Sequence, residues 1–223
     1  MKELFVYVEG PSDQLGMREL FSDVVEFVKE KGNVVDFYPL SGKERLLNNG
    51  PKKAINILRN RSNSYVFLVP DLYPPNKPFR HVNFEELKAE LRKRFDVERR
   101  RKGCDQDLAN RFFIHCFKYD LESLILASEE ALLSRLKKPD FSMRWANSVE
   151  NQNHKTPPKR IVEAIFRDAG MRYRDTVDVP WVLKRSCYKE LMKKCPQNFK
   201  LFVEDLFRVL DIEQNPNPGR IIL

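Results

Sequence analysis

Four short runs of mostly apolar, β-rich residues alternate with helical patterns, and this alternation constrains the fold more than any other feature. The runs cover residues 4–8, 34–40, 64–69 and 111–117, and helical patterns follow them over 15–28, 52–61, 84–101 and 121–136. Strands that alternate with helices form parallel sheets joined by crossover helices. Several of these runs are apolar almost throughout, which is typical of strands covered on both faces. The sequence therefore predicts an α/β fold with a mostly parallel central sheet flanked by helices.

The last third of the chain has a different character. Residues 139–158 are polar and loop-like, and helical patterns follow over 159–169, 179–195 and 198–210. Pro157 and Pro158 precede the first of these, as expected where a helix begins. We therefore expect an α/β domain over residues 1–138 and a helical extension over 139–223 that packs on the same core.

Polar groups follow each predicted strand at its end, and groups beyond the carboxyl ends of parallel strands share one edge of the sheet. In chain order they are Glu9, Gly10 and Asp13, then Lys43, then Asp71, then Asp120 and Glu122. Carboxylates that meet at one edge repel one another unless a cation joins them. Mg²⁺ is a hard cation that binds one or two carboxylates together with substrate phosphates, and it can orient a water for attack on a phosphodiester. Gly10 permits close approach of a backbone, and Lys43 can contact a phosphate.

Each carboxylate also has a structural interpretation. Asp13 and Asp120 can serve as helix N-caps, and Glu122 can be an acid in a first helical turn, favoured by the helix dipole. For Glu9 and Asp71 we favour a functional role, because burying a carboxylate at a strand end without a partner is costly.

The charge of the chain points to a polyanionic partner. It carries 40 Lys and Arg residues against 32 acidic residues, a formal net charge of +8, and much of the excess lies within residues 88–102 and 184–200. Such clusters suit nucleic acid, because each neutralised phosphate releases counterions. The alternative is a solvated face of a helix.

Other patterns narrow the class of protein. No apolar run is long enough to cross a bilayer and residues 1–9 lack a signal-peptide pattern, so we expect a cytoplasmic protein without a membrane partner. The four cysteines have no C-x-x-C spacing, which predicts free thiols. There is no Ser-His-Asp signature and no phosphate-binding loop motif. We expect core positions rather than functional ones for His115, Trp145, Trp181, Tyr173 and Tyr188, although the aromatic residues could stack bases.

Residues 6–13, Val-Tyr-Val-Glu-Gly-Pro-Ser-Asp followed by a helix, resemble the opening motif of TOPRIM domains. These domains occur in topoisomerases, primases and the OLD (overcoming lysogenisation defect) nucleases. The conserved glutamate of that family falls on Glu9, and its Asp-x-Asp motif falls on residues 71–73. Segments 120–127, 157–161 and 195–199 are similar to a group of uncharacterised prokaryotic TOPRIM-like proteins, so the resemblance spans most of the chain. It implies a compact α/β fold with a mainly parallel sheet.

The resemblance also implies a function, namely a metal-dependent nuclease that hydrolyses nucleic-acid phosphodiesters in prokaryotic defence, together with an ATPase partner. The resemblance places its conserved acids at Glu9 and Asp71 only. Together with the groups at the other strand ends, it leads us to expect catalytic roles for Glu9, Asp71 and Glu122, and Mg²⁺ or Mn²⁺ binding by Glu9, Asp13, Asp71 and Asp120. We expect phosphate binding by Gly10, Lys43, Lys159 and Arg160.

One position departs from the TOPRIM pattern. Tyr73 stands where the second aspartate of the Asp-x-Asp motif would be, and tyrosine is a poor Mg²⁺ ligand, because Mg²⁺ in proteins is held mainly by carboxylates and water. The alternative function is therefore a catalytically degenerate TOPRIM-like adaptor that binds nucleic acid or an ATPase partner. A primase-type nucleotidyl transferase has less support, because the sequence contains no evident zinc-binding or template-binding module.

Overall fold

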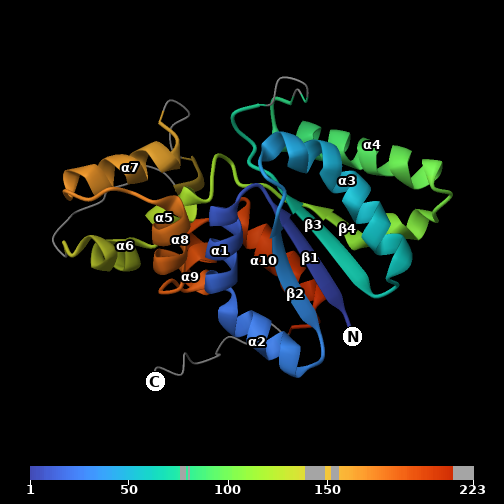
Figure 1. Ribbon diagram of the computed structural model, residues 1–223, viewed down its shortest axis with the longest axis horizontal. Helices are drawn as coiled ribbons and strands as arrows, with labels where there is room; N and C mark the ends of the chain where they lie inside the picture. Colours follow the sequence, from blue (N-terminus) through green and yellow to red (C-terminus); the bar gives the residue numbers. More distant parts are fainter. Residues whose placement is uncertain (76–78, 80, 139–148, 152–155, 213–223) are drawn as a thin grey trace.

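The computed structural model describes residues 1–223 except 76–78, 80, 139–148, 152–155 and 213–223. The described chain forms a four-stranded sheet in the order β2-β1-β3-β4, in which all neighbouring strands are parallel (Figure 1). The strands are β1 (Glu3–Val8), β2 (Val34–Pro39), β3 (Ser64–Val69) and β4 (Phe112–Ile114). The predicted α/β fold with a parallel central sheet is confirmed.

Helices cover both faces of this sheet (Figure 1). On one face, α3 (Lys43–Asn60) and α4 (Phe84–Arg101) pack over a buried cluster that includes Tyr7, Val66 and Leu68. On the other face, α1 (Pro11–Leu20), α2 (Ser22–Glu30) and α10 (Phe199–Val209) pack over Val6 and Phe67. Because successive side chains of a strand point to opposite faces, the apolar runs of the sequence supply both of these cores.

Several predicted helices have different boundaries in the structure. The pattern over 15–28 forms two helices that meet at Phe21, and the pattern over 121–136 divides at Ser128 into α5 (Glu122–Ala127) and α6 (Glu129–Leu136). The helix predicted to begin at residue 52 begins at Lys43 and contains Pro51. Gly50 lies against the Leu68 side chain, where a methyl group would come within 2.8 Å of Cδ1. Gly50 thus lets α3 cross closely over β3. The Gly50–Pro51 pair lies inside the helix and does not end it.

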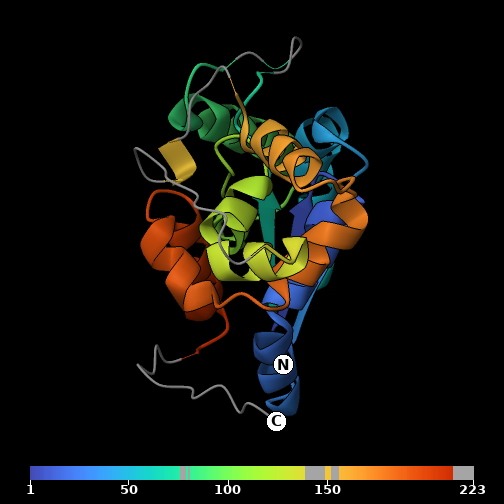
Figure 2. The same cartoon turned by 90° about the vertical axis from the view of Figure 1, so that its left-hand side faces the viewer.

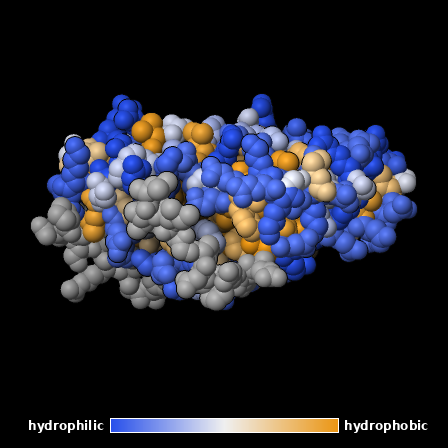
Figure 3. Space-filling model, turned by 90° about the horizontal axis from the view of Figure 1, so that it is seen from below, coloured by the Kyte–Doolittle hydropathy of each residue, from blue (hydrophilic) through white to orange (hydrophobic). Residues whose placement is uncertain are grey.

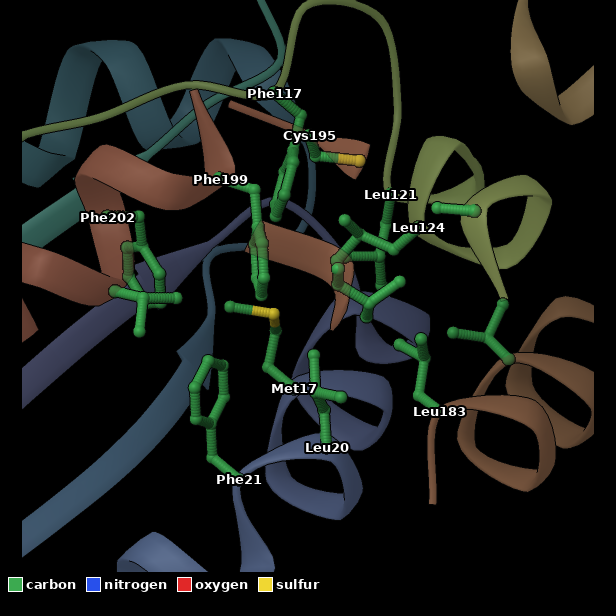
Figure 4. Packing of buried hydrophobic residues seen from close by; sticks show 14 of the residues in the cluster. Met17, Leu20, Phe21, Phe117, Leu121, Leu124, Leu183, Cys195, Phe199 and Phe202 are labelled. Carbon is green, nitrogen blue, oxygen red and sulfur yellow. The ribbon is translucent and has the colours of Figure 1, made fainter. Parts of the chain in front are cut away.

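The C-terminal helices pack on the same apolar core as the sheet. They are α7 (Pro158–Asp168), α8 (Asp175–Leu183), α9 (Tyr188–Lys194) and α10. Figure 4 shows Phe199 and Phe202 of α10 packed near Met17 and Phe21. Figure 1 shows α8 and α9 beside α1, and Figure 2 shows the orange helices α7 and α8 close to the yellow-green helices α5 and α6. The boundary between residues 138 and 139 stays a prediction, because it adjoins residues outside the described part.

A buried glutamate ties the start of α10 to the rest of the fold. Glu150, in the short 3₁₀ helix Val149–Asn151, is 4% exposed. Its carboxylate accepts hydrogen bonds from the backbone N–H groups of Gln197, Asn198 and Phe199 at 2.6, 2.9 and 3.0 Å. An anion at a helix N-terminus is stabilised by such unpaired N–H groups and by the helix dipole.

The outer edge of β2 is partly protected by hydrogen bonds within the chain. Val34 and Leu40 donate their N–H groups to β1 and its flanking residues, so the groups of alternate residues point away from the sheet. Of these, the N–H of Phe37 is bound by the Asp36 side chain at 2.9 Å, and the carbonyl of Phe37 accepts from Gln14 Nε2 at 2.8 Å. Pro39 has no N–H to offer.

Several further sequence predictions are settled by the described residues. All four cysteines are free thiols, and Cys116 is buried. His115 is 6% exposed and lies between the rings of Phe67 and Phe202, as expected of a core histidine. No helix in the described part of the chain is long and apolar enough to cross a membrane. Trp145 lies outside the described residues. The surface is mainly hydrophilic with scattered apolar residues on the face that Figure 3 presents.

Gly16 allows α1 and α8 to approach closely. A methyl group at this position would come within 2.6 Å of Val179 Cγ1 and 3.0 Å of Leu183 Cδ1. Contacts under 3 Å force backbone or side-chain shifts in a close-packed core. The absence of a side chain at Gly16 therefore lets α8, one of the C-terminal helices, pack closely against α1.

We predict that Gly16→Ala destabilises the protein. Alanine is favoured over glycine in a helix by about 1 kcal/mol, whereas overpacking costs about 1–3 kcal/mol. The expected net result is a lower Tm in thermal unfolding followed by circular dichroism, at about 2–4 °C per kcal/mol for a chain of this size. Asn49→Ala, at an exposed position of α3, is the control and should not lower the Tm. A Tm for Gly16→Ala at or above that of wild type would contradict the close approach.

Candidate functional site at the carboxyl edge of the sheet

The ends of β1 and β3 are joined by a hydrogen bond to a glutamate. Val8 pairs with Val69 in the parallel register, so the residues that follow these two strands lie side by side. The backbone N–H of Asp71 donates to Glu9 Oε1 at 2.9 Å. From the other side, Gly42 donates its N–H to the Glu9 carbonyl at 2.8 Å. The first, second and third strands thus converge on Glu9.

Burial raises the pKa of both central carboxyl groups. The pKa of Glu9 is raised by burial, against the lowering effects of the Asp71 N–H and the Lys43 charge. The pKa of Asp71 is raised well above its usual range by burial, to which the negative charges of Glu9, Asp13 and Asp120 add. Removal of carboxylates from water and their mutual repulsion both favour the neutral form. These charges repel one another in the absence of a cation.

Asp13 lies in the first turn of α1, directly beside this pair. Its Oδ2 accepts a hydrogen bond from the N–H of Gly10, the N-cap residue, at 2.8 Å, and Pro11 begins the helix. Asp13 is therefore not the N-cap residue that the sequence suggested, but it caps the helix from the third helical position. Burial raises its pKa to about 7, and the charges of Glu122 and Glu9 contribute to the rise. Asp13 thus belongs to the acidic edge as well as to the helix cap.

Asp120 follows β4 in the chain and reaches the acidic edge from the side of the sheet on which β4 lies. The segment beyond β4 continues beside the end of β3, where Asp71 bridges to Phe117. Asp120 Oδ2 accepts the backbone N–H of Lys159, in the first turn of α7, at 3.2 Å. Its other oxygen, Oδ1, is buried and has no hydrogen-bond partner among the described residues. Burial raises the pKa of Asp120 to about 7, and Glu122 adds to this rise.

Glu122 is held by residues of the C-terminal helices. Its side chain is 6% exposed, its Oε1 accepts the Tyr173 hydroxyl at 2.9 Å, and Lys159 Nζ lies 3.7 Å away. The same ammonium pairs with Asp175 Oδ2 at 2.9 Å. Burial raises the pKa of Glu122, and Lys159 and Tyr173 oppose the rise. The pKa of Lys159, which burial would lower, is raised overall by its hydrogen bond to Asp175 and by Glu122.

The basic residues predicted to bind phosphate are engaged in other contacts. Lys43, the first residue of α3, donates from Nζ to the carbonyls of Leu72 and Pro74 at 3.0 and 2.6 Å. Arg160 pairs with Glu163 at 2.8 Å on the exposed side of α7. Lys43 still interacts electrostatically with Glu9 and Asp71. The phosphate-binding roles of Gly10, Lys43, Lys159 and Arg160 stay predictions.

Many basic residues of α4, one of the two predicted clusters, also make intramolecular contacts. Guanidinium groups bind backbone carbonyls, amides and acids within the domain: Arg92 contacts Ala109, Arg94 contacts Asn48 and Glu90, Arg99 contacts Cys104 and Asp96, and Arg101 contacts Glu98. Much of this charge is therefore balanced within the fold. The α4 cluster is a weaker argument for a polyanion than the sequence indicated.

The sequence did not predict the roles of two residues that border the site. Tyr173 was expected in the core, and it does pack there, but its hydroxyl also binds Glu122. Asp175 is an ordinary acid in a first helical turn by sequence, and its pairing with Lys159 depends on the tertiary fold. The Tyr73 hydroxyl donates a hydrogen bond to the Val82 carbonyl at 2.6 Å, so this side chain does not act as the second aspartate of an Asp-x-Asp motif would.

The donor set fits a hard divalent cation. All five acids at this edge supply carboxylate oxygens, which Mg²⁺ and Mn²⁺ prefer, and Asp120 Oδ1 is a buried oxygen that lacks a partner among the described residues. Within the same residues, no three His, Cys, Asp or Glu side chains form a group close enough to hold a metal ion as they stand. Binding would therefore require these side chains to move together.

We predict that Asp120→Asn stabilises the metal-free protein at high pH. The pKa of Asp120 is about 7 in the fold and about 3.9 in an unfolded chain, so ionisation destabilises the fold increasingly as the pH rises from about 4 to above 7. Asparagine removes the charge and keeps an acceptor for Lys159. The expected Tm gain in EDTA at pH 8 is about 2–4 °C, or about 1 kcal/mol, and it should shrink towards pH 4. The exposed Asp168→Asn is the control, and equal gains at both pH values would contradict the burial of this charge.

Comparison with known proteins agrees with this architecture. The C-terminal region of the Burkholderia pseudomallei OLD protein superposes with a TM-score of 0.52 at 12% identity, covering 94% of this chain and 99% of that chain. The C-terminal region of the Xanthomonas campestris pv. campestris OLD protein gives a TM-score of 0.47 at 12% identity, covering 95% and 98%. At these identities the first likeness establishes the fold alone, which is the TOPRIM-like fold expected from the sequence. No curated protein sequence matches the chain.

The sequence also matches the model of one protein family. The match covers residues 8–206, from the end of β1 into α10, and so includes every residue of the acidic edge. The chain therefore belongs to the family described as domain of unknown function DUF4276.

Proposed function

We propose that this protein is a divalent-metal-dependent nuclease that hydrolyses nucleic-acid phosphodiesters at the carboxyl edge of its sheet. The observation that carries the proposal is the convergence of five acids, Glu9, Asp13, Asp71, Asp120 and Glu122, whose pKa values are all raised, mainly by burial. Burying several carboxylates close together destabilises a fold, and groups with such strongly shifted pKa values are found most often at functional sites. The TOPRIM-like fold supports the same class of function by analogy.

In this proposal Glu9 and Asp71 are the central ligands, and Asp13 and Asp120 are further ligands. Bound Mg²⁺ or Mn²⁺ would supply Lewis-acid stabilisation of the negative charge on the reacting phosphate. The Asp71 N–H fixes the Glu9 carboxylate, and the Gly10 N–H fixes that of Asp13. The backbone thus holds both carboxylates at the edge, and they would still have to move together with the other acids to bind the ion.

Glu122 and Lys159 are suited to proton transfer and charge neutralisation. Burial raises the pKa of Glu122, so its carboxylate can accept a proton from the attacking water as the new phosphorus–oxygen bond forms. The Lys159 ammonium, 3.7 Å from Glu122 Oε1, can neutralise charge on the departing oxygen as the scissile bond breaks. Asp175 holds that ammonium in place.

A second function, the TOPRIM-like adaptor, is favoured by two specific observations. Glu122 is already bound by Lys159 and Tyr173, and Tyr73 replaces a potential ligand. Part of the edge is thus neutralised by the chain itself. In this alternative the protein binds nucleic acid or an ATPase partner without catalysis. An ATPase partner and a role in defence belong to the proposal in both cases, and both follow from the resemblance to the OLD nucleases.

We predict that Glu9→Gln and Asp71→Asn each lower Mg²⁺- or Mn²⁺-dependent cleavage of mixed single- and double-stranded DNA and RNA by about 100-fold or more. Loss of a ligand should have at least the effect of losing a residue that orients one, which is about 10–100-fold. Glu26→Gln, an exposed change on α2, is the matched control and should cut at the wild-type rate. Equal activity, or equal inactivity, of all four proteins under every metal condition would remove the basis for a nuclease.

We predict that Mn²⁺ binding strengthens as the pH rises from 6 to 8 and releases protons. The pKa values of Asp13 and Asp120 are about 7 in the metal-free fold, and ligands must lose their protons to bind a metal. Isothermal titration calorimetry in two buffers of different ionisation enthalpy measures the released protons. Binding that is independent of pH would contradict these ligands, whereas no binding to wild type at millimolar Mn²⁺ would favour the adaptor.

A further inference from the structure

The segment between α7 and α8 has two sides. Residues 171–174 are not helical, and Arg174 has extended backbone angles (φ −133°, ψ 100°). Met171 and Tyr173 pack against the apolar core, whereas Arg172 and Arg174 are exposed. Alternation of this kind places residues two apart on the same side. The segment therefore presents two arginines to solvent and an aromatic residue to the protein.

Tyr173 fixes these arginines close to the acidic edge. Its hydroxyl binds Glu122 Oε1 at 2.9 Å, and its neighbours in the chain have Cα atoms only about 3.8 Å from its own. The Cα atoms of Arg172 and Arg174 are about 6.6 Å apart if the segment is fully extended. The side chains of Arg172 and Arg174 thus leave the backbone about the length of a tyrosine side chain away from the Glu122 carboxylate.

Nearby acids are already paired with other groups. Asp175 binds Lys159 at 2.9 Å, and Asp178 binds Arg135 at 2.6 Å and the backbone N–H of Arg174 at 2.6 Å. No ion pair or hydrogen bond of the Arg172 or Arg174 guanidinium group occurs within the described ranges. Two like charges on one side of a short segment repel one another, and an anionic ligand would relieve this repulsion.

We infer that Arg172 and Arg174 bind backbone phosphates of a nucleic-acid strand and guide it to the acidic edge. The inference rests on the proposed function for its site, and it adds the residues that hold the substrate beside that site. Arginine is suited to this role because its planar guanidinium binds phosphate oxygens in a bidentate manner. Positive charge beside the five acids would also offset their repulsion of an approaching phosphate.

The test measures binding apart from cleavage. Fluorescence anisotropy with a labelled 20-nucleotide single-stranded DNA, and with RNA of the same sequence, is recorded in EDTA from 50 to 200 mM NaCl. The double variant Arg172→Ala/Arg174→Ala should bind about tenfold or more weakly at low salt. Its slope of log affinity against log salt should fall by about 1.4, since each phosphate contact on a single strand contributes about 0.7. Arg172→Lys/Arg174→Lys should retain part of the binding.

A matched control removes the same charge elsewhere. Arg18→Ala/Arg59→Ala alters two exposed arginines of α1 and α3 that lie outside both basic clusters and should bind nearly as wild type does. Equal loss in both double variants would show binding by overall charge and overturn the inference, as would wild type that binds no nucleic acid. Competition by polyglutamate as strong as competition by unlabelled DNA would indicate an acidic protein partner and also overturn it.

The same set of proteins separates this inference from the proposed nuclease. Loss of binding in Arg172→Ala/Arg174→Ala, with no cleavage by wild type in Mg²⁺ or Mn²⁺, supports the arginines and removes the nuclease. Cleavage by wild type, with unchanged binding in this variant, supports the nuclease and overturns the role of the two arginines. Equal Tm values for wild type and both double variants show that all of them are folded.

Discussion

The central position of β1, with a parallel neighbour on each side, is the constraint on which the site depends. Parallel pairing in register brings the ends of β1 and β3 to the same edge, and the Asp71 N–H then reaches the Glu9 carboxylate. The next residues of the chain start α1 and bring Asp13 to the same place. Because the connections are crossovers, every strand delivers its following residues to this edge.

The acidic edge would be strongly repulsive without the C-terminal helices. Lys159 and Tyr173 compensate Glu122, and the first turn of α7 offers a backbone N–H to Asp120. These helices reach the edge because α8 crosses α1 closely at Gly16. The packing at Gly16, one helical turn after Asp13 and against Leu121, therefore helps to place the groups that balance the charge of the carboxylates. The carboxylates are held in a state that is costly for folding and suitable for binding a cation.

The sequence predicted the strands, the parallel sheet and the acids at the strand ends, because the alternation of apolar runs with helices determines where strand ends meet. It did not predict the breaks at Phe21 and Ser128, since apolar spacing continues across both positions. The start of α3 was misplaced because Gly-Pro is a common end of a helix, and only packing against Leu68 explains its interior position. Tyr173 lies 51 residues from its partner Glu122 in the chain, and the partners of Glu150 lie 47–49 residues from it. Contacts at such separations follow from tertiary structure and leave no local pattern.

The protected edge of β2 has a consequence for assembly. Proteins that associate by adding a strand to a sheet need a row of free N–H and C=O groups. On β2 both groups of Phe37 are already bonded within the chain, and Pro39 lacks an N–H. Strand addition is therefore disfavoured on this side, both for a partner protein and for a second copy of the chain. Association on this side of the molecule would therefore depend more on side chains than on backbone pairing.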